Sequence, residues 1–336
     1  MRRMINGALR RSRVLWIMVA IVQISAAHAG AQEVSWPVRP VTLIVPFAAG
    51  GPVDVVARVL AASLAEKLGK PVIVENIGGG GGMIGSARAA KAEADGYTIV
   101  IGNVGTHAGN QTLYRHPLYD AVKDFAPVAL VVQLPLVLVA RKDFPASDLT
   151  SFIAYAKAHA STLQFGSGGT GSTTHLACAL LNSAAGISAT HIPYKGGAPA
   201  MQDLIAGRID YLCIDPPVAR PQIEAKTVKA IAVLSRDRSS GLPSLPTAEE
   251  QGVNNIDITN WFALFAPKDT DAAVVKKLHD ATVAAMESET LQKQLKQIGA
   301  DVVAPERRSS AYLASFVRSE IEKWAGPIKA SGLHAD

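Results

Sequence analysis

The sequence predicts an α/β protein of two lobes, each built on a mixed or parallel sheet flanked by helices. Strand-like and helix-like segments alternate from Val41 onward, which is typical of sheets whose faces are covered by helices. The chain has 336 residues, and even without an export signal this exceeds what one hydrophobic core usually organises. Two lobes are therefore expected.

The first 31 residues predict a cleavable secretory signal peptide. Five arginines among the first thirteen residues precede an apolar run from Val14 to Ile24. This run is shorter than the ~20 residues that a membrane-spanning helix needs, and small residues follow it. Cleavage after Ala29 and cleavage after Ala31 both satisfy the small-x-small rule. We expect the mature chain to be exported and not inserted in the membrane.

The charge of the mature chain excludes a polyanionic partner. The formal net charge of +5 comes from the whole sequence, and the signal peptide holds five arginines and no acid, so the mature chain is close to neutral. No other stretch gathers lysine and arginine into a patch, so neither nucleic acid nor an anionic membrane is expected as a partner.

The two cysteines, Cys178 and Cys213, leave two alternatives open. Export to an oxidising compartment permits a disulfide. Each cysteine also lies in an apolar segment, where a buried free thiol packs well.

In the first part of the chain, short apolar runs predict strands and amphipathic runs predict helices. Asp54 is expected to open the first helix, and Ser147 to cap a helix that carries Leu149 and Phe152 on its apolar face. The expected strands are Val41–Pro46, Val72–Val74, Tyr97–Ile101 and Val137–Ala140, and a further helix is expected over Met83–Ala92.

The second part repeats this alternation and ends in helices. Strands are expected at Ser188–Ile192, Tyr211–Ile214 and Val228–Leu234, with helices at His175–Leu181, Met201–Ala206 and Val218–Glu224. Leu242–Pro246 is a proline-rich connection. The closing helices are expected at Asp271–Glu287, Thr290–Ile298 and along a final apolar stripe from Tyr312 to Trp324.

Two strand-to-helix turns of small residues, whose backbone N–H groups are expected to be uncovered, predict an anion-binding site. The first turn of a helix has N–H groups without partners and a positive dipole end, and glycine lets a ligand approach the backbone. Either turn alone also fits a tight turn selected for its geometry; both in one chain favour binding. The candidate ligand-binding residues are Phe47, Ala48, Ala49, Gly50 and Gly51 in the first turn, and Gly168, Gly169, Thr170, Gly171, Ser172 and Thr173 in the second.

Three further polar residues are candidates. Asp215 follows a predicted strand, where its carboxylate either accepts from a donor on the ligand or caps a helix or turn. His107 and His175 are able to donate to a carboxylate, although a capping or packing histidine is the commoner case.

Other site chemistries lack sequence support, and we expect no cofactor, no metal and no catalysis. Gly80-x-Gly82-x-x-Gly85 fits a dinucleotide fingerprint, but it does not follow the first strand of its unit, and Gly102 and Asn103 stand where an acid should end the next strand. The histidines have no metal-ligand spacing. Gly166-Ser167-Gly168 is not a hydrolase elbow.

The chain resembles the Bug family, the substrate receptors of tripartite tricarboxylate transporters, from Trp36 to about Gly299. The resemblance is carried by an ordered series of motifs: Pro37-x-Arg39-Pro40 through Phe47, Gly50-Gly51-x-x-Asp54-x-x-Ala57-Arg58, Val74-Glu75-Asn76, Ala94-Asp95-Gly96-Tyr97-Thr98, Gly171-Ser172-x-x-His175-Leu176-Ala177, His191-x-Pro193-Tyr194-Lys195-Gly196 and Pro199-Ala200-x-x-Asp203-Leu204. Ala49 departs from the proline that many relatives carry.

The resemblance implies a two-lobed periplasmic binding protein of the Venus flytrap type, with two hinge crossings. Lobe 1 would combine residues 32–138 with 259–336, and lobe 2 would be residues 139–258. A ligand carboxylate would be held between the two turns, which adds Asp54, Ser167 and Thr174 to the candidate residues. The implied partners of a monomeric receptor are a small carboxylate and the membrane subunits of the transporter.

Two other functions fit parts of the sequence. A receptor that reports ligand occupancy to a membrane signalling protein would have the same sequence features. An exported hydrolase would need Ser172 and His175 as a pair, for which no acid partner is evident.

Overall fold

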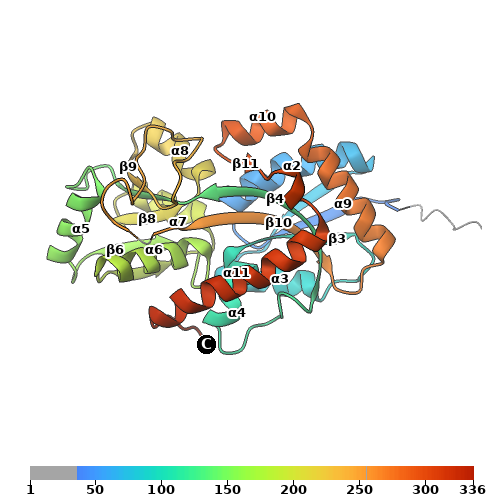
Figure 1. Cartoon of the computed structure of the whole chain (residues 1–336), viewed down its shortest axis with the longest axis horizontal. Helices are drawn as coiled ribbons and strands as arrows, with labels where there is room; N and C mark the ends of the chain where they lie inside the picture. Colours follow the sequence, from blue (N-terminus) through green and yellow to red (C-terminus); the bar gives the residue numbers. More distant parts are fainter. Residues whose placement is uncertain (1–35, 255) are drawn as a thin grey trace, which may run out of the picture. The chain divides into compact units, whose positions relative to one another are not determined.

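Two mixed β-sheets with helices on their faces organise the chain, as the sequence predicts (Figure 1). The structure is a computed structural model that describes residues 36–254 and 256–336. The expected signal peptide, residues 1–31, lies outside the described residues. Among the described helices, none combines the length and apolar character that a membrane crossing requires.

The first sheet has the strand order β11-β4-β10-β3-β1-β2. β1 pairs in parallel with β2 and β3, and β10 pairs antiparallel with β3 and β4. Its strands are β1 (Val41–Val45), β2 (Val72–Asn76), β3 (Thr98–Asn103), β4 (Phe125–Pro135), β10 (Thr259–Pro267) and β11 (Asp301–Val302). The helices connected to it are α2 (Pro52–Leu68), α3 (Met83–Ala90), α4 (Asn110–Leu113), α9 (Ala272–Met286), α10 (Glu289–Gln297) and α11 (Ser310–Ala330).

The second sheet has the strand order β7-β6-β8-β5-β9. β6 pairs in parallel with β7 and β8, while β5 pairs antiparallel with β8 and β9. Its strands are β5 (Val137–Arg141), β6 (Gln164–Ser167), β7 (Thr190–Pro193), β8 (Tyr211–Ile214) and β9 (Val228–Val233). Its helices are α5 (Leu149–Ala158), α6 (Thr173–Ala185), α7 (Gly197–Ile205) and α8 (Pro216–Glu224).

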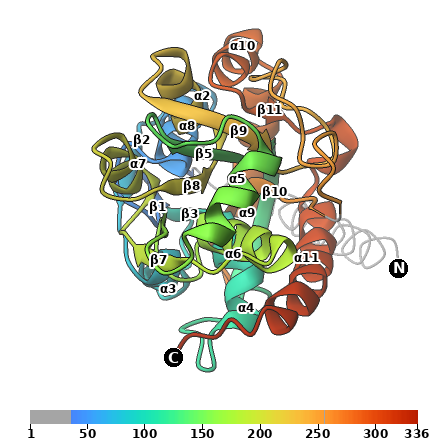
Figure 2. The ribbon, with the colours of Figure 1, turned by 90° about the vertical axis from the view of Figure 1, so that its left-hand side faces the viewer.

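Alternate residues of β8 face opposite helix layers, as a pleated strand requires. Leu212 and Ile214 belong to an apolar cluster with residues of α7 and α8. Tyr211 packs edge-on against Phe152 of α5, with ring centroids 5.1 Å apart, and Cys213 is bonded to Cys178 of α6. The second sheet therefore lies between α7 and α8 on one side and α5 and α6 on the other (Figure 2).

The chain passes between the two sheets twice. β4 leads into β5 through Leu136, and residues 234–258 lead from β9 back to β10. Leu136, Leu234 and Ile258 join these connections through backbone hydrogen bonds, and β4 and β10 run side by side (Figure 1). β5 belongs wholly to the second sheet, so the change of sheet comes before Val137 and not within this strand.

Most expected elements are confirmed, and the differences lie in the starts of helices, in one cap and in elements that were not expected. The helix expected from Met201 begins at Gly197, and α4 and β11 were not expected. The first helix begins at Pro52, two residues before Asp54. Asp148, not Ser147, caps α5, because the Asp148 side chain accepts from the Ser151 N–H and forms a capping box. The long strands β4 and β10, and the short β6, were not expected.

Cys178 and Cys213 form a disulfide, which decides between the two alternatives. The bond ties α6 to β8; α6 begins at the cavity described below, and β8 ends just before Asp215, which lines it. It closes a loop of 35 residues, which stabilises a fold by about 3–4 kcal/mol in the chain-entropy relation.

We expect the double variant Cys178→Ser and Cys213→Ser to unfold at a lower temperature by several degrees, because the unfolded chain gains freedom that the bond removes. Differential scanning calorimetry measures this. Adding reductant should lower the transition temperature of the wild type by a similar amount and leave the double variant unchanged. Equal transition temperatures in all samples would contradict this role.

Candidate functional site

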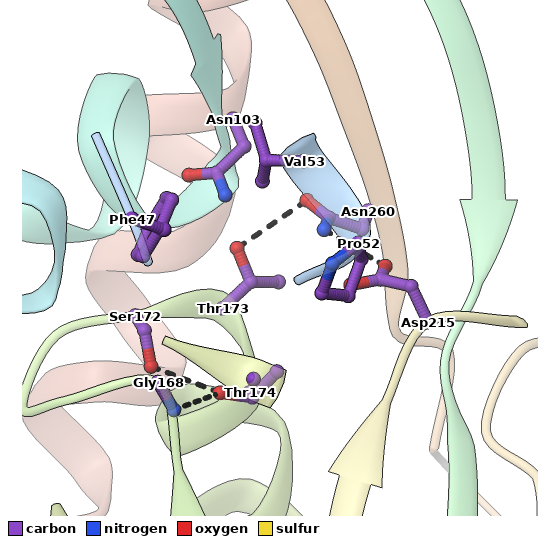
Figure 3. A pocket seen from close by; sticks show the side chains of 11 residues that line it. Phe47, Pro52, Val53, Asn103, Gly168, Ser172, Thr173, Thr174, Asp215 and Asn260 are labelled. Carbon is purple, nitrogen blue, oxygen red and sulfur yellow. Dashed lines mark hydrogen bonds between the residues drawn. The ribbon is translucent and has the colours of Figure 1, made fainter. Parts of the chain in front are cut away.

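A cavity between loops of the two sheets is the candidate site (Figure 3). It contains about 310 Å³ of empty space, part of which opens to solvent. The residues that line it come from the ends of strands and the starts of helices: Phe47, Pro52, Val53, Asn103, Gly168, Ser172, Thr173, Thr174, Gly197, Asp215 and Asn260.

Four helices begin at this cavity. Pro52 and Val53 start α2, Ser172 caps α6, Gly197 starts α7, and Asp215 occupies the N-cap position of α8. Each helix N-terminus brings a partial positive charge, and those of α2, α6 and α7 also bring N–H groups that the helix itself cannot satisfy; α8 begins with Pro216 and Pro217, which have no N–H. The helix dipoles therefore supply positive partial charge to a cavity whose described lining residues include one acid, Asp215, and no lysine, arginine or histidine.

The first turn is held from behind by Asp54, which does not line the cavity. The Asp54 carboxylate accepts from the Gly50 N–H at 2.8 Å, from Arg58 Nε at 2.9 Å and from Asn76 Nδ2 at 2.8 Å. Burial raises the pKa of Asp54, but these hydrogen bonds outweigh it and lower the pKa below its ordinary value. Asp54 is thus an ionised anchor that fixes the turn.

The second turn is held by its own side chains. The Gly168 N–H donates to Thr174 Oγ1 at 2.8 Å, and the Gly169 N–H donates to Ser167 Oγ at 3.0 Å. The Gly171 N–H donates to His175 Nδ1 at 3.2 Å. These N–H groups are therefore occupied, and the expectation that the glycine amides of both turns are bare is wrong for Gly50, Gly168, Gly169 and Gly171.

The donors left to a ligand are the N–H groups of the helix starts and one hydroxyl of the Ser172–Thr174 pair, because the Thr173 hydroxyl donates to Asn260 and one hydroxyl of that pair donates to the other. Thr173 and Thr174 are the first two residues of α6, where N–H groups lack intrahelical partners. Their hydroxyl groups and that of Ser172 face the cavity beside Gly168 (Figure 3). The second turn thus presents an anion-binding surface that is polar but uncharged.

A hydrogen-bonded chain crosses the cavity wall from one sheet to the other. The Gly105 N–H donates to Thr173 Oγ1 at 3.0 Å, and Thr173 Oγ1 donates to Asn260 Oδ1 at 3.3 Å. Asn260 Nδ2 donates to Asp215 Oδ1 at 2.9 Å, while the Trp261 N–H donates to Asn260 Oδ1 at 3.0 Å. These bonds fix the orientation of the Asn260 amide, which is held between Thr173 and Asp215 (Figure 3). Asn260 itself belongs to β10 of the first sheet.

Backbone atoms of the two sets of loops lie in direct contact, which only glycine permits. A Cβ on Gly81 would lie 2.1 Å from the Thr170 carbonyl oxygen, and one on Gly105 would lie 2.7 Å from the Gly171 carbonyl oxygen. The Ala48 N–H also donates to the Lys195 carbonyl at 2.9 Å. Within the glycine run, Gly78 and Gly81 therefore serve contact between loops, since a Cβ on Gly78 would lie 2.7 Å from the Lys195 carbonyl oxygen.

The structure brings six of the candidate residues to the cavity wall: Phe47, Gly168, Ser172, Thr173, Thr174 and Asp215. Asp54 and Ser167 support the turns from behind. The remaining loop candidates, Ala48, Ala49, Gly50, Gly51, Gly169, Thr170 and Gly171, form the backbone of the turns without lining the cavity.

His107 lies away from the cavity wall and packs in an aromatic cluster. Its ring stacks on Phe265 with centroids 4.0 Å apart, and its Nδ1 lies 2.9 Å from Thr106 Oγ1. Burial lowers the pKa of His107 to about 3, which keeps the imidazole neutral. This geometry is that of a packing histidine.

Ser172 and His175 do not form the pair that a hydrolase would need. Ser172 Oγ accepts from the backbone N–H of His175 at 3.3 Å and lies 3.0 Å from Thr174 Oγ1. The His175 ring accepts from Gly171 and stacks on His191, with centroids 4.1 Å apart. In the described part of the chain, no group of His, Cys, Asp and Glu side chains could hold a metal ion.

Sequence reasoning missed Pro52, Val53, Asn103, Gly197 and Asn260 as lining residues. Asn103 carried a signal, since it is a polar residue at the end of a buried strand. Asn260 carried a weaker one, because it directly precedes the apolar run Trp261–Pro267. In the structure Asn260 is only 1% exposed.

Comparison with known proteins places this geometry in a family. Residues 56–333 match the family model described as the tripartite tricarboxylate transporter family receptor, TctC. The periplasmic binding protein BugD superposes with a TM-score of 0.87 and is 38% identical, covering 90% of this chain and 100% of BugD.

Two solved structures from Rhodopseudomonas palustris are also similar. MatC with bound malate has a TM-score of 0.85 and 38% identity, covering 87% of this chain and 100% of MatC. A protein with adipate has a TM-score of 0.85 and 35% identity, covering 89% of this chain and 99% of its own. The matched family is one of receptors and not of enzymes. The chain therefore belongs to the Bug family of tripartite tricarboxylate transporter receptors.

Proposed function

We propose that this receptor captures a small carboxylate in the cavity and delivers it to the membrane subunits of a tripartite transporter. The observation that carries the proposal is the convergence of four helix N-termini and three hydroxyl groups on one cavity. A carboxylate accepts hydrogen bonds only, and it gains the favourable dipole of each helix at the same time.

Capture would involve closure of two lobes, one built on the first sheet and one on the second, with β5 wholly in the second lobe. The hydrogen bonds from Gly105 to Thr173 and from Ala48 to Lys195 would form when the lobes meet. The side chains of Phe47, Thr173 and Thr174 would then enclose the acid. Asp54 and Ser167 would hold the two turns in place, because both accept hydrogen bonds from glycine N–H groups of those turns.

The solved relatives support a carboxylate as the ligand. MatC holds malate and the second R. palustris protein holds adipate, two diacids of different length. Because the two acids differ, the relatives support a class of ligand and not one particular acid. Membership of the family and the expected signal peptide support delivery to membrane subunits and a periplasmic location.

Calorimetric titration of the purified mature protein with mono-, di- and tricarboxylates tests the proposal. We expect at least one acid to bind with a dissociation constant in the micromolar range or tighter, which corresponds to about 8 kcal/mol. Mass spectrometry of the small molecule retained after native purification identifies the acid independently. Absence of binding and of any thermal shift across the panel would overturn the proposal.

A further inference from the structure

Asp215 is a buried acid that lines the cavity without a positively charged partner there. Its side chain follows β8 and is 2% exposed. The described residues that line the cavity include no lysine, arginine or histidine. Burying an ionised carboxylate costs free energy unless another group compensates its charge.

The residues that follow explain why this carboxyl group does not cap its own helix. Asp215 occupies the N-cap position of α8, but Pro216 and Pro217 come next and have no N–H to donate. The N–H of Val218 donates to the Asp215 backbone carbonyl at 3.2 Å. The side chain therefore makes no capping bond, and Asn260 Nδ2 donates to its Oδ1 at 2.9 Å.

Four arginines on or beside the surrounding elements are paired with acids other than Asp215. The ion pairs on these elements are Asp54–Arg58 on α2, Arg141–Asp210 beside β5 and β8, Asp203–Arg208 after α7, and Arg220–Glu224 on α8. Burial raises the pKa of Asp215 to about 7, although the hydrogen bond from Asn260 lowers it in part. Asp215 is thus poised to ionise when a positive group arrives.

We propose that Asp215 binds the ammonium group of the ligand, so that the cavity takes amino acids in preference to acids that lack an amino group. This inference rests on the proposed function. The helix starts would hold the carboxylate, and the Asn260 side chain alone separates the Thr173 hydroxyl from Asp215 in the hydrogen-bonded chain. An amino acid presents its two charges across a similarly short span.

Matched pairs of ligands test the inference by calorimetry. The pairs are L-aspartate with succinate, L-glutamate with glutarate, and L-phenylalanine with 3-phenylpropanoate, whose members differ by one ammonium group. In the pair that binds tightest, we expect the wild type to bind the amino acid with a dissociation constant at least tenfold lower than that of its partner acid. Asp215→Asn should remove this preference, whereas Asp143→Asn, at an exposed site, should retain it.

Proton exchange in the wild type gives a readout that needs no variant. An ammonium group favours ionised Asp215, so binding of an amino acid at pH 7 should release a proton. The affinity for the amino acid should therefore rise between pH 6 and pH 8. An acid without an ammonium group should bind with uptake of a proton, and its affinity should fall between pH 6 and pH 8. Titration in two buffers of different ionisation enthalpy measures the number of protons exchanged.

The outcomes separate this inference from the proposed function. Binding of simple acids with no preference for amino acids, or a preference that survives in Asp215→Asn, overturns the role of Asp215 and leaves carboxylate capture intact. Failure of every carboxylate to bind the wild type overturns both.

Discussion

Gly105→Ala is expected to lower ligand affinity at least a hundredfold while the protein still folds. The added Cβ would lie 2.7 Å from the Gly171 carbonyl oxygen and 2.8 Å from the Thr173 backbone nitrogen. Both atoms belong to the turn of the second sheet, so the clash disappears if the lobes stay apart. The variant should therefore remain open and lose the cavity, as calorimetry with the tightest-binding acid would show.

Gly105 is a cleaner test than Gly81, whose Cβ would come closer still to the opposite turn. Gly81 has φ of 58°, so any side chain there also strains the backbone. Gly326→Ala is the matched control, because nothing lies within 4 Å of a Cβ at that position of α11. Wild-type affinity in Gly105→Ala would show that contact between the two turns is not needed for binding.

The elements that the sequence predicts correctly have either one clear hydrophobic periodicity or a clear boundary. Val41–Val45 is a short β-branched run that a glycine-rich turn ends, and α6 follows a turn of small residues. β4 and β10 lack such signals. They are buried on both faces and read as long apolar runs that a buried helix could equally produce.

The position of both turns was predictable, but the groups that contact a ligand were not. Glycine and serine before an apolar helix predict a helix start with free N–H groups. Whether Asp54 or His175 already occupies an N–H group depends on side-chain geometry that no spacing encodes. Asn260 reaches the cavity from a strand more than forty residues after Asp215, which is a tertiary contact.

Asp215→Asn is expected to stabilise the ligand-free protein at pH 8 and to change it little at pH 4. An unfolded aspartate has a pKa near 3.9, whereas burial raises the pKa of Asp215 to about 7 in the folded chain. Between these values the unfolded state loses its proton and the folded state keeps it, so the wild type loses stability as the pH rises. Above pH 7 both states are ionised and the loss is constant, up to about 4 kcal/mol.

Denaturant unfolding of ligand-free wild type and Asp215→Asn at pH 4, 6 and 8 measures this difference, and Asp143→Asn controls for the loss of one surface charge. Other titrating groups, including His175 and His191, are present in both proteins and cancel in the comparison. A stability difference that does not grow with pH would contradict the buried, uncompensated state of Asp215. If the stability difference between Asp215→Asn and the wild type grows with pH and disappears when an amino acid is bound, the ligand supplies the missing positive charge. Binding would then compensate the same carboxylate that destabilises the empty receptor.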